Sequence, residues 1–255
     1  MPQSRLAGAS LFSAAPGDAD HLDYWRQSQR PLTSLIFVLP FLFLYEGGVL
    51  LLGSSAMRNG AEVWLTQLLD LAGFEQSFLL PLLVIVALLG WHHLTGDRWR
   101  VRSGVTLAMG LECAVLGFVL MLIAQLHRPL LHAIGTPLAA AARGPIAQFF
   151  ASFVSYCGAG IYEEVMFRLL LLPAVAICIR AFGVPLGTSF LWSALVTSLL
   201  FSAAHHVGPH GEALELFKFT FRVTAGLFFS LLFIFRGFGI VVGTHALYDI
   251  FVGLL

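Results

Sequence analysis

Long runs of apolar residues constrain the fold of this chain more than any other feature of its sequence. A helix needs about 20 apolar residues to cross the hydrocarbon core of a bilayer. Charged residues make up only 11% of the chain, less than half of the roughly 25% usual in a soluble domain. We therefore expect an all-α, polytopic transmembrane helix bundle. Its candidate spans are residues 31–53, 76–93, 104–126, 145–182, 186–207, 217–235 and 238–255.

The stretch 145–182 leaves the number of spans at seven or eight, because it is too long for one untilted crossing. It is either one tilted helix that ends near Pro173, or two crossings with a break in the glycine-containing segment 158–160. Depth favours the break. At 1.5 Å per residue, Glu163 in a single helix lies roughly 27 Å from its outer end, and we expect it to miss His205 on the next antiparallel helix. The distribution of positive charge favours the single crossing instead.

The regions outside the spans carry their own signals. Residues 1–30 are polar and lack the apolar core of a signal peptide, so we expect a cytosolic tail. Residues 59–74 place apolar side chains at helical spacing between polar ones, which is typical of an interfacial amphipathic helix. The positive-inside rule then predicts a cytosolic N-terminus in a cytoplasmic (inner) membrane. The arginines behind this prediction are Arg26, Arg30, Arg98, Arg100 and Arg102.

Ionisable residues inside the apolar runs are candidates for function, because hydrocarbon selects against them. Glu164 and Arg168 lie four residues apart with the acid first, which is the favoured order for an ion pair on a helix. Glu163 points to another face and has no local partner, so its desolvated carboxylate is a candidate general base or acid. The full set is Glu46, Glu112, Glu163, Glu164, Arg168, His205, His206, Arg222, His245 and Asp249.

Two further pairs share a helix face at a spacing of four residues. Phe201 precedes His205 in this way, and His245 precedes Asp249. A lone histidine is most often a satisfied core residue, and a His–Asp pair can be structural. A carboxylate beside an imidazole also fixes its tautomer and raises its basicity. The signal becomes strong because acid, base and orienting residues lie on three separate apolar helices in one half of the chain.

These three groups together resemble the motif set of the CPBP family, the CAAX proteases and bacteriocin-processing enzymes also called abortive-infection proteins. The resemblance covers about residues 155–255, and residues 31–144 show no usable motif. It implies a CPBP-like catalytic membrane core, which we place at 145–255, after the polar tail (1–30) and the N-terminal spans (31–144) that composition indicates. It also implies a cavity open to water and lipid in an all-helical intramembrane endopeptidase.

The resemblance also assigns roles to the six residues as catalytic residues of a glutamic-type protease. Glu163 activates water for peptide hydrolysis, and Glu164 with Arg168 forms the supporting ion pair. His205 assists the water or binds the carbonyl. His245 and Asp249 stabilise the oxyanion. Members of the family have Asn or Asp at the last position, and an ionised Asp cannot donate to an oxyanion. Asp249 must therefore be protonated or must act by orienting His245.

Several alternatives stay open on the sequence. The same residues could ligate zinc, although the chain has no His-Glu-x-x-His motif, and we favour a reaction without a cofactor. A proton-coupled transporter could also use buried carboxylates and histidines, and an immunity or scaffold factor could keep the fold.

The expected partners are membrane lipid and a protein or peptide substrate. The net charge of +0 gives no reason to expect nucleic acid. Cys113, Cys157 and Cys178 lie in apolar segments and are expected to be buried free thiols.

Overall fold

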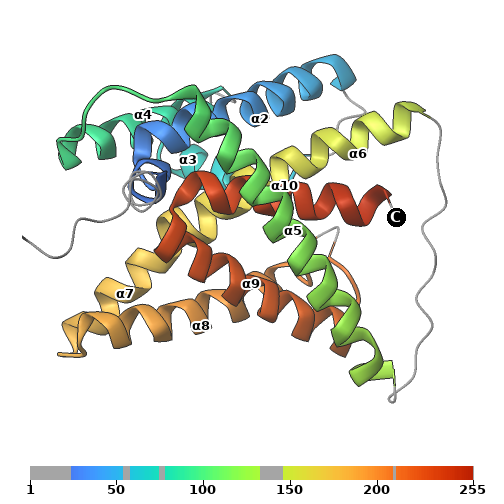
Figure 1. Cartoon of the computed structure of the whole chain (residues 1–255). Helices are drawn as coiled ribbons and strands as arrows, with labels where there is room; N and C mark the ends of the chain where they lie inside the picture. The colour runs from blue at the N-terminus through green and yellow to red at the C-terminus, as the bar shows by residue number, and fades with distance from the viewer. Residues whose placement is uncertain (1–23, 54–57, 75–77, 133–145, 209–210, 255) are drawn as a thin grey trace, which may run out of the picture.

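The computed structural model describes residues 24–53, 58–74, 78–132, 146–208 and 211–254, and their regular secondary structure is entirely helical (Figure 1). This confirms the predicted all-α membrane bundle. Of the described helices, α2, α5, α8 and α9 are long and apolar enough to span a membrane, and α4 and α10 are shorter apolar helices. The choice between seven and eight crossings stays a prediction. The helices are α2 (Pro31–Leu52), α3 (Gly60–Leu71), α4 (Leu79–Thr95), α5 (Ser103–His132), α6 (Ile146–Gly158), η2 (Ala159–Glu163), η3 (Val165–Leu171), α7 (Leu172–Ala181), α8 (Leu186–Ala204), α9 (Leu216–Arg236) and α10 (Phe238–Leu254).

The long apolar stretch forms one uninterrupted helical segment from residue 146 to residue 181. Its central part, η2 and η3, consists of wider π-helical turns, a form often found at functional sites. The expected helix end near Pro173 is wrong. Pro173 lies in α7, directly after the π-helical turns of η3, and the helix continues through it to Ala181. The expected break at the glycines is also absent, since the π-helical turns continue the helix through them.

Glu163 and His205 meet in spite of this continuous helix, which corrects the depth argument. α7 and α8 pack against each other as an antiparallel pair, joined by a short turn (Figure 1). Nearly the same number of residues separates Glu163 and His205 from that turn. Residues equidistant from the turn of an antiparallel pair lie at the same level, and the two side chains approach to 3.8 Å.

Helix α10 lies at the centre of the bundle and packs against α2, α5, α9 and η2 (Figure 1). Its approach to η2 is close enough to require glycine. A Cβ atom at Gly160 would lie 2.9 Å from both the Val242 carbonyl oxygen and the Ala246 Cβ. Small residues allow such close contacts between membrane helices. This contact brings Glu163, at the end of η2, next to His245 on α10.

Helix α3 forms where the amphipathic pattern predicts it, and the Asn59 side chain caps its N-terminus by accepting from the Ala61 N–H at 2.9 Å. The helix contacts η2 and α4. Its buried face includes Leu65 and Glu62, whose carboxylate accepts hydrogen bonds from Arg58 and from Tyr45 on α2. The helix therefore joins the N-terminal spans to the segment that carries Glu163. An interfacial position for it stays a prediction.

An ion pair between a buried arginine and a partly buried glutamate connects α5 to α9. Arg236 donates from Nε and Nη2 to the two carboxylate oxygens of Glu112, each at 2.6 Å. Tyr24 donates to the same carboxylate, and the Arg236 guanidinium lies 3.7 Å from the centre of the Trp25 ring. The last residues of the predicted tail, 24–30, therefore pack on this pair. Residues 1–23 of that tail lie outside the described residues.

The three cysteines are free thiols. Cys113 and Cys157 are buried as predicted, whereas Cys178 on α7 is exposed. The expectation for Cys178 is therefore wrong. An apolar position on a membrane helix can face lipid as well as protein, so an apolar neighbourhood in the sequence does not imply burial inside the bundle.

Candidate active site

Glu164 and Arg168 form the ion pair that their spacing predicts, with 3.1 Å between Arg168 Nη1 and Glu164 Oε1. Both side chains are buried, with exposures of 0% and 1%. Arg168 also donates from Nη2 to the Gly226 carbonyl on α9 at 3.1 Å. Its guanidinium lies 4.6 Å from the centre of the Phe201 ring. Through Arg168, the pair thus connects η3 to Phe201 on α8 and to Gly226 on α9.

His245 is held between two carboxylates and an aromatic ring. Its Nδ1 donates to Glu164 Oε1 at 2.6 Å, and its Nε2 lies 3.6 Å from Asp249 Oδ2. The imidazole stacks on Phe229, with 4.5 Å between ring centres. The sequence indicated the contact with Asp249 but not the contact with Glu164, which joins residues on two distant helices. The Glu164 contact orients the ring so that Nε2 faces Glu163 at 3.8 Å.

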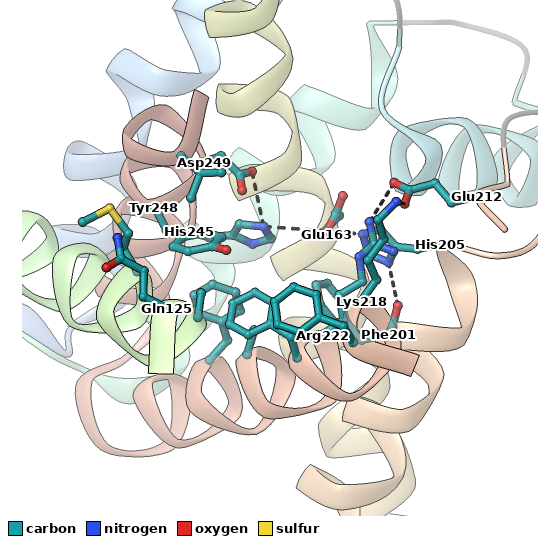
Figure 2. Close-up of a pocket in the computed structure, with 17 residues that line it drawn as sticks. Gln125, Glu163, Phe201, His205, Glu212, Lys218, Arg222, His245, Tyr248 and Asp249 are labelled. Carbon is teal, nitrogen blue, oxygen red and sulfur yellow. Dashed lines mark hydrogen bonds and ion pairs between the residues drawn. The ribbon is translucent and has the colours of Figure 1, made fainter. Parts of the chain in front are cut away.

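His205 presents the same atom to Glu163 from the opposite side. Its Nδ1 lies 2.8 Å from the Phe201 carbonyl oxygen. A carbonyl can only accept, so Nδ1 carries the proton and Nε2 is left available. That Nε2 lies 3.8 Å from Glu163 Oε2. Both imidazoles therefore aim Nε2 at one carboxylate oxygen (Figure 2).

Glu163 has a partner that the sequence did not indicate. The Asn59 side-chain amide donates to Glu163 Oε1 at 2.9 Å. This contact comes from residues 31–144, where the sequence shows no usable motif. Asn59 lies in a loop, and its only sequence signal is its position just before the amphipathic helix. The second oxygen, Oε2, faces the two histidines.

These side chains line a cavity of about 840 Å³ between α5, α8, α9 and α10. Figure 2 shows Glu163, His205, His245 and Asp249 converging on one part of its wall, with aromatic rings from α9 on another. Polar groups gathered in a mainly apolar cavity are typical of a ligand or substrate site. The remaining lining residues are Met121, Ala124, Gln125, Phe201, Glu212, Phe217, Lys218, Phe221, Arg222, Ala225, Phe229, Tyr248 and Val252.

A second charged group borders the same cavity. Glu212 accepts from Arg222 Nη2 at 2.8 Å and lies 3.2 Å from Lys218 Nζ. Partial burial raises the pKa of Glu212, but the hydrogen bonds and charges of Arg222 and Lys218 outweigh this effect and hold the pKa below its ordinary value. Arg222, a candidate from the sequence, therefore belongs to this ion-pair group at the cavity.

The other candidates from the sequence lie away from the converging carboxylate and imidazoles. Glu46 accepts a hydrogen bond from Tyr162, the residue before Glu163, and Glu112 pairs with Arg236. His206 Nδ1 donates to the Glu212 carbonyl at 2.9 Å. Within the described part of the chain, no group of three or more His, Cys, Asp or Glu side chains is arranged to hold a metal ion.

Comparison with known proteins finds one similarity, which covers the part of the chain that carries this site. Residues 145–251 match the family model described as type II CAAX prenyl endopeptidase Rce1-like. No curated protein and no solved structure matches the chain. The matched region contains all six residues that the motifs identified. The match confirms the resemblance to the CPBP family and, together with the apolar helices, supports an integral membrane protease. Residues 145–251 of this chain are thus similar to the Rce1-like CAAX endopeptidase family.

Proposed function

We propose that this protein is an intramembrane endopeptidase in which Glu163 activates the water that attacks the peptide bond. The observation that carries the proposal is the position of Glu163 Oε2, 3.8 Å from Nε2 of both His205 and His245. These distances are too long for direct hydrogen bonds, and polar groups at such separations are commonly bridged by water. The oxygen also borders a cavity large enough for an extended peptide segment, at about 840 Å³.

The reaction balances with water as the only co-reactant. Glu163 takes a proton from the water, whose oxygen bonds to the carbonyl carbon while the carbonyl π electrons move to the oxygen. The resulting tetrahedral oxyanion then collapses. Glu163 passes its proton to the amide nitrogen, and the C–N bond breaks with its electron pair on nitrogen. A carboxylic acid and an amine leave, and Glu163 is again a carboxylate.

The two histidines have different roles because their Nδ1 atoms have different partners. His205 donates a hydrogen bond from its Nδ1–H to the Phe201 carbonyl, so its Nε2 accepts from the water and helps to orient it. His245 lies between Glu164 and Asp249. When it is protonated, its Nε2–H can donate to the oxyanion. Asp249 acts through His245 or in its own protonated form.

Glu164 and Arg168 hold His245 in place in this arrangement. Glu164 Oε1 is shared between Arg168 and His245. A carboxylate buried without a cation would be strongly destabilising, and Arg168 supplies that cation beside Glu164 and His245. We assign this pair the role of holding the His245 ring rather than contacting the substrate.

The family description makes a protein or peptide with a prenylated C-terminal motif the first substrate class to test. Membrane lipid is the expected surrounding partner, since exposed apolar side chains such as Leu51, Leu94 and Phe182 cover the outer helices. We place the protein in the cytoplasmic membrane with its N-terminus in the cytosol, on the arginine distribution of the first loops.

The test compares membranes from a strain with the parent protein, one with Glu163→Ala and one with Asp70→Ala, an exposed acid on α3 that serves as a matched control. Quantitative membrane proteomics should reveal an uncleaved precursor in Glu163→Ala only. Purified parent protein should cleave a quenched peptide with a prenylated Cys-aliphatic-aliphatic end, and Glu163→Ala should not. Thermal unfolding of both variants checks that they are folded. If no polypeptide changes length in the folded Glu163→Ala strain and the parent leaves the peptide intact, a transporter, immunity or scaffold role replaces this proposal.

A further inference from the structure

Asn59 reaches the site from the N-terminal part of the chain, outside the region that matches the family model. Its side-chain nitrogen lies 2.9 Å from Glu163 Oε1, and its side-chain oxygen accepts from the Ala61 N–H, also at 2.9 Å. The second contact fixes the orientation of the amide, because only the oxygen can accept from a backbone N–H. The NH₂ group must therefore point to Glu163.

We propose that Asn59 is a positioning residue for Glu163, an inference that rests on the proposed role of Glu163 as the general base. The Asn59 hydrogen bond occupies Oε1 and so fixes the plane of the carboxylate. The other oxygen, Oε2, is then directed at the space between the two Nε2 atoms of His205 and His245. Without this hydrogen bond the carboxylate could rotate, and either oxygen could leave the position that faces the water.

Asn59 is itself held from two directions. Its backbone N–H donates to the Tyr45 hydroxyl oxygen at 3.3 Å, and Tyr45 donates to Glu62. Arg58 donates to the same Glu62 carboxylate, which is only 2% exposed. These three residues, Tyr45, Arg58 and Glu62, form a clamp around the start of α3. A hydrogen bond from a residue held this firmly can orient its acceptor rather than follow it.

The clamp also touches the segment that carries Glu163. The Tyr45 ring meets the Tyr162 ring edge to face, with 5.4 Å between centres. Tyr162 donates to Glu46 on α2 and directly precedes Glu163 in the chain. The donor and the acceptor of the Asn59–Glu163 hydrogen bond are therefore supported by one set of packed residues on α2, α3 and η2.

The competing explanation is that Asn59 serves only as the N-cap of α3. A cap requires an acceptor, and Asp, Ser and Asn are all good caps. Orientation of Glu163 requires a donor, which Asp lacks when ionised. Asn59→Asp and Asn59→Ser therefore keep the cap and remove the amide donor. A Ser hydroxyl that caps the helix is also too short to replace the amide at Glu163.

The experiment uses the full chain and measures kcat and KM on the quenched prenylated peptide, together with thermal unfolding. Asn59→Asp should lower kcat by about a hundredfold or more, and Asn59→Ser by about tenfold or more, with KM changed by less than about threefold; a misplaced catalytic group can cost this much. Both variants keep the helix cap and should stay folded, with at most the small loss of stability that goes with one hydrogen bond. Gln67→Glu, an exposed amide-to-acid change on the same helix, should match the parent.

A second measurement does not depend on turnover. The infrared carboxylate band of Glu163 is identified as the band that disappears in Glu163→Gln. Loss of the Asn59 hydrogen bond should shift that band in Asn59→Ser but not in Gln67→Glu. One outcome is an inactive Glu163→Gln variant, with the parental kcat and the parental band in both Asn59 variants. In that case Asn59 is only a helix cap, and the inference about Asn59 fails while the proposed function stands. If Glu163→Gln keeps full turnover, the proposed function fails, and the band still shows whether Asn59 holds the carboxylate.

Discussion

The Glu112–Arg236 and Glu164–Arg168 pairs of this protein are alike in chemistry, but their surroundings differ in one respect. Glu112 and Arg236 satisfy each other with two hydrogen bonds, and Tyr24 and Trp25 cover them. Glu164 and Arg168 share a single contact, which leaves room for His245 on Glu164, and a further carboxylate follows on the same segment. The first pair is closed, whereas the second supports groups that face a cavity.

Under the proposed function, the comparison indicates what separates a structural ion pair from one at an active site. Both pairs lie on apolar helices, so their presence alone does not identify a site. The Glu164–Arg168 pair differs from the Glu112–Arg236 pair because further polar groups lie next to it that do not pair directly with one another. Glu163 and the Nε2 atoms of His205 and His245 have no strong direct contact with one another, and all border the cavity. Changes to the open group should affect turnover, and changes to the closed pair should affect stability.

The largest expected effect is at Glu163. Glu163→Gln keeps the size of the side chain but cannot take a proton, so turnover should fall by about a thousandfold or more, within the range for loss of an acid–base group. Glu164→Gln should lower kcat less, because it weakens the contacts with Arg168 and His245 without removing the base. Steady-state rates of both variants at matched protein levels check this order. Equal losses in two folded variants would contradict the different roles of the two acids.

The next effect is at the closed pair. Glu112→Ala leaves Arg236 buried without its carboxylate, which should lower the free energy of unfolding by about 3–5 kcal/mol. The folded fraction should keep detectable activity, as should Glu46→Ala. Thermal unfolding and peptide cleavage measured on the same samples check both statements. The double variant Glu112→Leu/Arg236→Met should recover much of the stability, since it removes both charges together. Complete inactivity of a folded Glu46→Ala protein would instead move Glu46 into the site.

Asp249 tests whether the open group acts with or without a metal. Asp249→Asn removes the ionisable oxygen but can still accept from His245 and can now donate a hydrogen bond. Activity should stay within about a hundredfold of the parent, the scale of one oxyanion donor. Asp249→Ala should be worse. The control is the zinc content of the purified parent: stoichiometric zinc that is lost in Asp249→Asn, together with activity, would establish metal chemistry in place of the glutamate mechanism.

The sequence predicted the parts of this molecule that depend on short-range pattern. Apolar runs identified the helices, and spacings of four residues identified the Glu164–Arg168 pair and the neighbourhood of His245 and Asp249. Contacts between distant segments were not predictable in the same way. Asn59 reaches Glu163 only because α3 packs against η2, and nothing in the local sequence encodes that approach. The contact of His245 with Glu164 likewise depends on the close packing at Gly160.

The break or end that we expected in the helix that carries Glu163 is not found, again because local sequence does not contain the tertiary contacts. Glycines and a proline in residues 158–173 indicated a break, because both residues disfavour α-helix. In the structure Gly160 lies in the π-helical turns of η2 and Pro173 lies in α7, and the helix runs through both residues without interruption. Packing against α10 favours the continuous helix over a broken one, and the helix propensities of single residues carry no information about that packing.

The smallest expected effect is at a third charge cluster, which has the same chemistry as the two pairs but lies in a more exposed place. Glu212 contacts Arg222 at 2.8 Å and Lys218 at 3.2 Å, and its side chain is 43% exposed. Solvent screens such contacts, so Glu212→Gln should cost less than about 1 kcal/mol of stability at pH 7.

The pH dependence of that cost follows from the lowered pKa of Glu212. A carboxylate whose pKa is lower in the folded state contributes stability above its ordinary pKa of 4.5 and loses it as the pH falls through the lowered value. The difference in unfolding temperature between the parent and Glu212→Gln should therefore be small at pH 7 and vanish in acid. Unfolding curves of both proteins at pH values from neutral to well below 4.5 check this. A difference that grows on acidification would contradict the sign of the shift, and one as large as that of Glu112→Ala at pH 7 would show that burial is not what distinguishes the clusters.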